Sequence, residues 1–219
     1  AENFFGPPIA GEPHEQVLSV HHLDPDPPGQ AWLQVALQGV TGVEHRVRIN
    51  LNELELGEIS FRDQERGEIE VPLTPAQVIE GENRLLLEAM GDETDVSLLE
   101  SVRLSWWHAF IADGDSLRFP ATSGELLAVS GFTSPQIRAV DITDPGSPIE
   151  AAASVEPDGV GYSIRFRVPG SGQRTILAFA QEKALSPDSL SPNLPSSWKE
   201  EKEGRDLVII APTPLHPSL

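Results

Sequence analysis

The densest group of possible metal ligands in the sequence is the proline-rich turn at residues 21–26. Two histidines and two aspartates fall within it: His21, His22, Asp24 and Asp26. Imidazole nitrogens and carboxylate oxygens together suit zinc or manganese. Adjacent residues of an extended chain point to opposite faces, however, and zinc sites that use two histidines space them more widely. We therefore interpret this turn as a solvated loop and predict no metal there.

Two short acidic segments carry the type of oxygen ligand that calcium prefers. One contains Asp92 and Asp95, and the other contains Asp113 and Asp115. A calcium site needs about six to eight oxygens, usually drawn from several segments, and neither segment matches a complete coordination loop. Two interpretations remain open for each segment, a structural calcium ion or an ordinary acidic turn. We favour the acidic turn.

The sequence contains no evident catalytic arrangement. It has no cysteine, which excludes a cysteine nucleophile, a disulfide and a thiolate metal site within these 219 residues. With 34 aspartates and glutamates, close carboxylate pairs are expected by chance and do not indicate a glycosidase. Ser123-Gly124 and Ser130-Gly131 lack the strand–turn–helix setting of a hydrolase nucleophile, and there is no glycine-rich phosphate loop. We predict that this chain has no catalytic residue and binds no cofactor.

The charge of the chain narrows the classes of partner. Lysine and arginine number 15 against 34 acidic residues, so the formal net charge is −19. Such a charge repels phosphate backbones and anionic lipid, and we predict no nucleic-acid partner. No apolar run approaches the ~20 residues of a membrane helix, so no membrane insertion is expected. The opening segment has no basic-then-apolar leader, and we expect it to begin at a cut within a longer chain. Acidic, soluble chains of this kind suit an extracellular or cell-surface location.

The elements that must position these residues are predicted to be strands. Residues 96–110 alternate between apolar and polar side chains, with Glu100 and Trp107 out of phase, which indicates a bulge or a sheet edge near each. A hairpin turn is expected at Asn52-Glu53, and a single helical turn is expected after Thr74. Alternation recurs in three earlier segments: 31–38, 43–51 and 54–61. Short strands separated by many of the 20 prolines and 18 glycines predict an all-β chain.

The strand spacing divides the chain into four regions. Residues 1–15 are a lead-in, and residues 16–110 form a two-sheet β-sandwich. Residues 111–185 form a smaller, immunoglobulin-like β-sandwich. Residues 186–219 contain a linker, a C-terminal helix at 196–204 and a continuous apolar strand at 206–211. Because apolar strands without alternation belong to parallel sheets covered by helices, this last region is expected to be the start of a truncated α/β domain.

Three short motifs occur in order within the first sandwich: Leu51-Asn52, Leu56-Gly57 and Gly81-Glu82-Asn83-Arg84-Leu85. Together they resemble galactose-binding-like jelly rolls. The resemblance implies a jelly-roll fold for residues 16–110 and a sugar-binding surface built from aromatic side chains. Jelly rolls of this type often hold a structural calcium ion, so calcium stays the alternative to an acidic turn at the acidic segments. Trp32 and Trp107 are the candidates for stacking on a sugar. The alternative is that Trp106 lies in the core and Trp107 covers the junction between the domains, and we favour it.

A longer series of motifs extends over most of the chain. It consists of Val102–Trp106, Val140–Pro145 (Val-Asp-Ile-Thr-Asp-Pro) and Gly204–Ile210. This order resembles the region that precedes the catalytic domain in gingipain-like cysteine peptidases of bacteria, whose catalytic domain has a caspase-like fold. Two positions depart from the pattern: Asn52-Glu53 replaces an Asn-Gly hairpin, and Trp106 stands where tyrosine is expected. The catalytic histidine and cysteine of the family lie beyond the opening strand of the peptidase domain, so no position here takes either role.

The resemblance implies a non-catalytic accessory region of a secreted or surface cysteine peptidase. Such a region would support or position the catalytic domain, or dock substrate. Its partners would be the downstream peptidase domain of the same polypeptide and a protein or glycan substrate. The alternative function is that of a carbohydrate-binding module.

Overall fold

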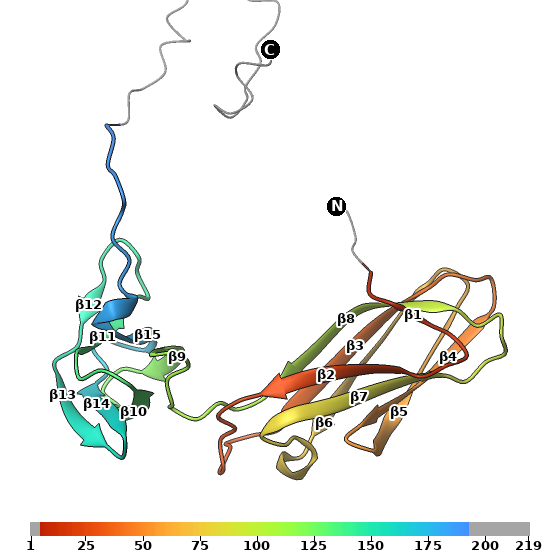
Figure 1. Ribbon diagram of the computed structural model, residues 1–219, viewed down its shortest axis with the longest axis horizontal. Coiled ribbons are helices and arrows are strands. Elements are labelled where there is room, and N and C mark those ends of the chain that lie inside the picture. Colours follow the sequence, from red (N-terminus) through yellow and green to blue (C-terminus); the bar gives the residue numbers. More distant parts are fainter. Residues whose placement is uncertain (1–4, 193–219) are drawn as a thin grey trace, which may run out of the picture. The chain divides into compact units, whose positions relative to one another are not determined.

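The computed structural model describes residues 5–192 and consists almost entirely of strands (Figure 1). The predicted helix at 196–204 and the predicted apolar strand at 206–211 lie outside the described residues. The helical elements within residues 5–192 are two 3₁₀ turns, Pro75–Gln77 and Gln181–Lys183. Neither turn has the length or the apolar character of a membrane-spanning helix. The prediction of an all-β chain with two β-sandwiches is confirmed.

Eight strands form the first sandwich, in sheets of order β1-β8-β3-β6 and β2-β7-β4-β5. The pairs β1·β8, β2·β7, β3·β6 and β4·β5 are all antiparallel. This is the pairing of one long hairpin folded over into two sheets, which is a jelly roll. The strands are β1 (Pro8–Ile9), β2 (His14–Val20), β3 (Ala31–Gly39), β4 (Glu44–Leu51), β5 (Leu54–Arg62), β6 (Arg66–Leu73), β7 (Gly81–Ala89) and β8 (Ser97–Ser105).

The core of the first sandwich lies between its two sheets. Alternate residues of β3 and β4 point inward, as the period of two predicts, and Val35, Leu37, Val47 and Ile49 are fully buried. Each such side chain contributes about 1.5–3 kcal/mol through burial. Strand β1 and the beginning of β2 precede residue 16, where the first strand was expected. A two-residue strand such as β1 is too short to show a period, although its Ile9 is fully buried.

The irregularity predicted at Glu100 is a β-bulge. Ala36 on β3 lies opposite Ser101, and Leu37 lies opposite Leu99, so Glu100 is the additional residue of β8. A bulge shifts the inward face by one residue. The inward positions of β8 are therefore odd-numbered before the bulge and even-numbered after it. The outward positions after the bulge are Ser101, Arg103 and Ser105, all of which are exposed.

Two asparagines of the jelly-roll motifs join the β4–β5 hairpin to the connection between β6 and β7. Asn83 is fully buried; its amide nitrogen donates to the Ile79 carbonyl (2.8 Å), and its oxygen accepts from the Ile79 N–H (3.0 Å). The Asn52 amide donates to the Asn83 oxygen (2.9 Å), and the Asn52 oxygen accepts from the Arg84 N–H (2.9 Å). Asn52 and Glu53 both have positive φ, 51° and 68°, as a two-residue hairpin of type I′ requires. The predicted hairpin is thus present, and Asn52 and Asn83 hold the turns in place.

The second sandwich contains seven strands in sheets of four and three, the strand count of an immunoglobulin-type constant domain. The sheet orders are β12-β11-β15-β9 and β10-β14-β13. Its core is separate from the first and is built around residues such as Phe132, Ile164 and Phe166. The strands are β9 (Ser116–Thr122), β10 (Leu126–Phe132), β11 (Ile137–Asp141), β12 (Ile149–Glu150), β13 (Ala153–Asp158), β14 (Gly161–Arg167) and β15 (Gln173–Ala180).

The Val140–Pro145 motif ends β11 through the side chain of Asp141. One carboxylate oxygen of Asp141, which is fully buried, accepts from the Thr143 N–H (3.0 Å) and hydroxyl (2.6 Å). The other accepts from the Arg174 guanidinium at 2.7 and 2.6 Å. Burial raises the pKa of Asp141, but the Thr143 hydrogen bonds and Arg174 lower it further, so the pKa lies below its ordinary value. This motif, too, has a structural role.

Candidate ligand-binding site

Two tryptophans at one end of the first sandwich are only half buried. Trp32 on β3 is 41% exposed, and Trp107, just after β8, is 46% exposed. Trp106, which directly precedes Trp107, is partly buried against the core, and its indole N–H donates to the His21 carbonyl (3.3 Å). Tryptophan is usually well buried, so two half-exposed indoles make this end of the sandwich a candidate binding surface.

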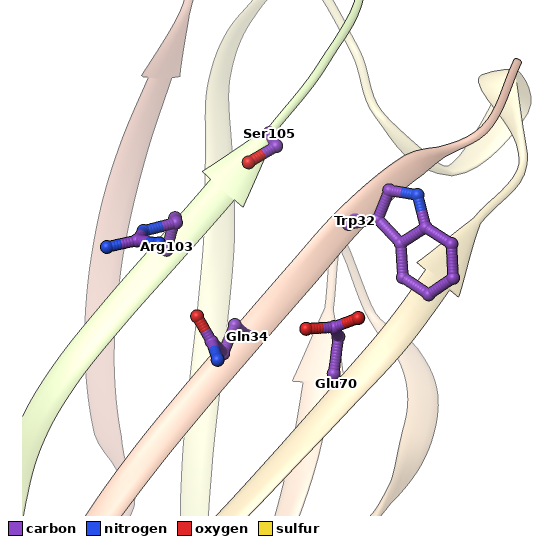
Figure 2. Close-up of a pocket in the computed structure, with 5 residues that line it drawn as sticks. All are labelled: Trp32, Gln34, Glu70, Arg103 and Ser105. Atoms are coloured by element: carbon purple, nitrogen blue, oxygen red, sulfur yellow. The ribbon is translucent and has the colours of Figure 1, made fainter.

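A row of polar side chains lies beside Trp32 on the outward face of the sheet. Gln34 of β3 pairs in register with Glu70 of β6 on one side and with Arg103 of β8 on the other. Ser105 lies opposite Trp32 in the next row. Figure 2 shows the row running from Arg103 through Gln34 to Glu70, with the Trp32 indole on the Glu70 side of β3. These five residues line a hollow of about 260 Å³.

A second hollow adjoins the first at Trp32 and Ser105. It measures about 250 Å³ and is lined by Gln30, Trp32, Ser105, Trp106 and Trp107. The Trp107 indole lies against Gly29, where an added Cβ would come within 3.1 Å of the indole nitrogen. The Trp107 carbonyl accepts from the Asp24 N–H (2.8 Å). The turn at residues 24–29 therefore supports Trp107 and leaves its outer face open.

The charges next to the first hollow are already paired. Arg66 forms ion pairs with Glu68 and with Glu100, and the Gln34 amide donates to Glu68. The hydrogen bonds from Arg66 and then from Gln34 lower the pKa of Glu68. Within residues 5–192, neither Glu70 nor Arg103 has an oppositely charged side chain within 4.0 Å. The lining of the hollow thus combines one free carboxylate, one free guanidinium, an amide and a hydroxyl.

The ligand-rich turn at residues 21–26 does not gather its four side chains around one point. The His21 carbonyl holds Trp106, and an Asp24 carboxylate oxygen accepts from the Asp26 N–H (3.0 Å). His22 instead contacts Asp113 through its Nε2 (3.1 Å). Among the described residues, no group of three or more histidine, aspartate or glutamate side chains is arranged to hold a metal ion.

The four aspartates considered for calcium accept hydrogen bonds from protein groups. Asp92 accepts from the N–H and the hydroxyl of Thr94, and Asp115 from those of Thr133. Asp113 contacts the Nε2 atoms of His22 and His108. Asp95 is fully buried and contacts His45 Nδ1 at 2.7 Å.

Sequence reasoning identified Trp32 and Trp107 as sugar-stacking candidates but did not include four polar residues that share their hollows: Gln34, Glu70, Arg103 and Ser105. A signal was present, because each falls on the outward parity of its strand. Parity assigns a residue to a face, however, and says nothing about which strands are neighbours. The order β8-β3-β6 brings the four together.

No family model and no curated protein matches the sequence. Among solved structures, the chain is similar to dimeric latent PorU from Porphyromonas gingivalis, with a TM-score of 0.60 and 14% identity over 88% of this chain and 20% of that one. Neither sandwich alone makes up 88% of the chain, so the similarity includes residues of both. The likeness shows the fold, that of a β-sandwich region which also occurs within a much longer protein.

Two further solved structures match the chain at lower TM-scores. One is the carbohydrate-binding module CBM36 in complex with calcium and xylotriose (TM-score 0.34, 9% identity, 45% of this chain and 78% of that one). The other is a Paenibacillus cycloisomaltooligosaccharide glucanotransferase complexed with cycloisomaltoheptaose (TM-score 0.32, 9% identity, 78% and 41%). These TM-scores are too low to support an argument about function.

Proposed function

We propose that this chain is a non-catalytic accessory region of a larger extracellular or cell-surface cysteine peptidase. It would support or position the catalytic domain, or dock protein substrate. The observation that carries the proposal is the similarity to PorU, which includes both sandwiches but only 20% of the PorU chain. The absence of cysteine from all 219 residues supports placing the catalytic nucleophile elsewhere in the polypeptide.

The test is made on the complete polypeptide. Its reading frame should encode a domain of alternating strands and helices with a histidine and a cysteine at strand ends. Peptidase activity is then compared between the full protein and a version lacking residues 16–110. If the sandwich docks substrate, KM for protein substrates rises while turnover of short peptides is retained; if it supports the catalytic domain, both activities fall. Unchanged activity on both substrates, or a frame without those two residues, contradicts the proposal.

A second function is favoured by one observation. Trp32 and Trp107 are both half exposed and line one hollow at the end of the jelly roll. An indole presents a flat apolar face to the C–H face of a sugar, and adjacent polar groups can orient its hydroxyls. We propose carbohydrate binding at this surface, either alongside the accessory role or as the whole function of the chain.

This second role is tested by screening the chain against an array of glycans with fluorescence detection. Wild-type protein should bind at least one class of glycan, and Trp32→Ala should abolish that binding. Leu126→Ala is the control, because Leu126 is a large apolar side chain, 62% exposed, on β10 of the second sandwich. Equal glycan binding by wild type and Trp32→Ala would contradict the proposal that glycans bind at the surface formed by Trp32 and Trp107.

A further inference from the structure

The two hollows beside Trp32 adjoin each other. Trp32 and Ser105 line both of them. Their volumes are about 260 and 250 Å³, each slightly below the ~300–1,000 Å³ of small-molecule sites. Each hollow also has a half-exposed tryptophan at its border, Trp32 in the first and Trp107 in the second. The surface therefore has the form of two neighbouring subsites.

The polar lining of the first subsite narrows the chemistry of its ligand. Glu70 can only accept hydrogen bonds when ionised, Arg103 can only donate, and Gln34 can do both. The side chains that could neutralise them are occupied, because Arg66 is paired with Glu68 and Glu100. A ligand of either net charge would be attracted by one of these two side chains and repelled by the other, so the lining favours neither sign of charge. A neutral ligand rich in hydroxyl groups, each of which donates and accepts, can satisfy all three.

We propose that these two subsites bind a neutral oligosaccharide, with one sugar unit beside Trp32 and the next beside Trp107. The inference rests on the carbohydrate-binding role proposed above and specifies its ligand. Trp32 belongs to both hollows and is the principal contact. Trp107 contacts only the second unit, so it contributes to the binding of chains and not of single sugars. The outward-facing row on β6, β3 and β8 orients the hydroxyls of the first unit.

The experiment measures affinity as a function of chain length, by calorimetry and by tryptophan fluorescence. The probes are neutral xylo-, cello- and malto-oligosaccharides of one to six units, with oligogalacturonides as an acidic series and chitosan oligosaccharides as a basic series. For at least one neutral series, affinity should rise by roughly tenfold or more between one and three units, because the second subsite adds contacts to a ligand already held by the first. The charged series should bind no more tightly than the neutral one.

The variants assign the subsites. Trp107→Ala should lower affinity for the trisaccharide by roughly 30-fold, the effect of losing one aromatic anchor, and leave monosaccharide binding as in wild type. Trp32→Ala should abolish binding of every length, and Leu126→Ala should change nothing. Far-UV circular dichroism checks that each variant is folded.

The outcomes separate this inference from the role on which it rests. Equal affinity for one and three units, an unchanged affinity of Trp107→Ala, or tighter binding of a charged series overturns the two-subsite neutral ligand while carbohydrate binding stands. Failure of every series to bind overturns the carbohydrate-binding role as well.

Discussion

Replacing Asp95 by asparagine should destabilise the first sandwich by an amount that depends on pH, because Asp95 holds the buried ring of His45. His45 Nδ1 lies 2.7 Å from the Asp95 carboxylate, and its Nε2 lies 2.8 Å from the Asp63 carbonyl and 3.1 Å from the Thr41 carbonyl. His45 and Asp95 are both fully buried. All three partners accept hydrogen bonds, so only the imidazolium, with an N–H at each nitrogen, satisfies them all.

The magnitude follows from the contacts that asparagine loses or weakens. The second Asp95 oxygen accepts from the backbone N–H groups of Gly91 (3.2 Å) and Arg46 (3.3 Å). Removing one partner of a buried ion pair costs about 3–5 kcal/mol, and a hydrogen bond to a charged group is worth about 1.5–3 kcal/mol. Asparagine retains the shape and one acceptor oxygen, so we expect Asp95→Asn to cost about 2–3 kcal/mol. We expect Asp95→Ala to cost about 3–5 kcal/mol.

The pH dependence has a definite sign. Burial lowers the pKa of His45, but its hydrogen bonds to Asp95, Asp63 and Thr41 raise it further, so the folded pKa lies above the ordinary value of 6.5. A raised folded pKa gives stabilisation that is complete below the unfolded pKa and is lost as pH rises through the folded pKa. The difference in unfolding free energy between wild type and Asp95→Asn should therefore shrink above about pH 6.5, by at most ~1.4 kcal/mol per pH unit.

The assay is urea unfolding followed by tryptophan fluorescence between pH 5.5 and 9. Trp32, Trp106 and Trp107 all report on the first sandwich, and a Trp198→Phe background removes the fourth tryptophan of the chain. The other histidines are the same in both proteins, so their contributions are expected to cancel in the difference. Glu93→Gln is the control, because Glu93 is an exposed acid two positions away. A difference that stays constant or grows with pH refutes the reasoning.

Three further changes test the structural roles of the motifs and of one close contact. Asp141→Ala leaves the guanidinium of Arg174 unpaired and should destabilise the second sandwich by about 3–5 kcal/mol, measured by calorimetry; no loss would contradict the motif's structural role. Asn83→Ala leaves the Ile79 N–H and carbonyl and the Asn52 amide without the Asn83 side chain as a partner, and should cost at least ~2 kcal/mol in urea unfolding. Gly67→Ala places a Cβ against the ring of Phe61 and should cost about 1–3 kcal/mol, whereas Gly42→Ala, whose nearest atom lies at 3.8 Å, should be almost neutral in the same assay.

Local elements with strong sequence signals were predictable. The hairpin at Asn52-Glu53 and the bulge at Glu100 occur where expected. Thr74 and Gln77 form a capping box at the expected 3₁₀ turn. Each depends on residues close together in the chain. The short strands β12 and β13 were not predicted, because two exposed residues in β12 and a largely exposed β13 give no alternating burial to detect.

The candidate site was only partly predictable, because its residues come from three strands far apart in the sequence. Trp32 and Trp107 stood out by residue type alone. Gln34, Glu70 and Arg103 are ordinary polar residues on wet strand faces, and they form a row only because β6, β3 and β8 are neighbours. His22 likewise contacts Asp113 and not the aspartates of its own turn. The conformation of a turn depends on residues close together in the chain. The order of the strands depends on which arrangement buries the apolar side chains of the whole core.

The sequence by itself determined the all-β class of this protein, the division into two sandwiches, its strong negative charge and the lack of any cysteine chemistry. These follow from periodicity, turn residues and composition, all of which are properties of the chain before it folds. Only the tertiary structure decided that the asparagines of the jelly-roll motifs join turns and that Asp95 is buried against His45. It also decided that two half-exposed tryptophans line one hollow and that a polar row lies in the hollow next to it. Those relations depend on which strands pair. Pairing depends on packing between segments far apart in the sequence, which a local sequence pattern does not predict.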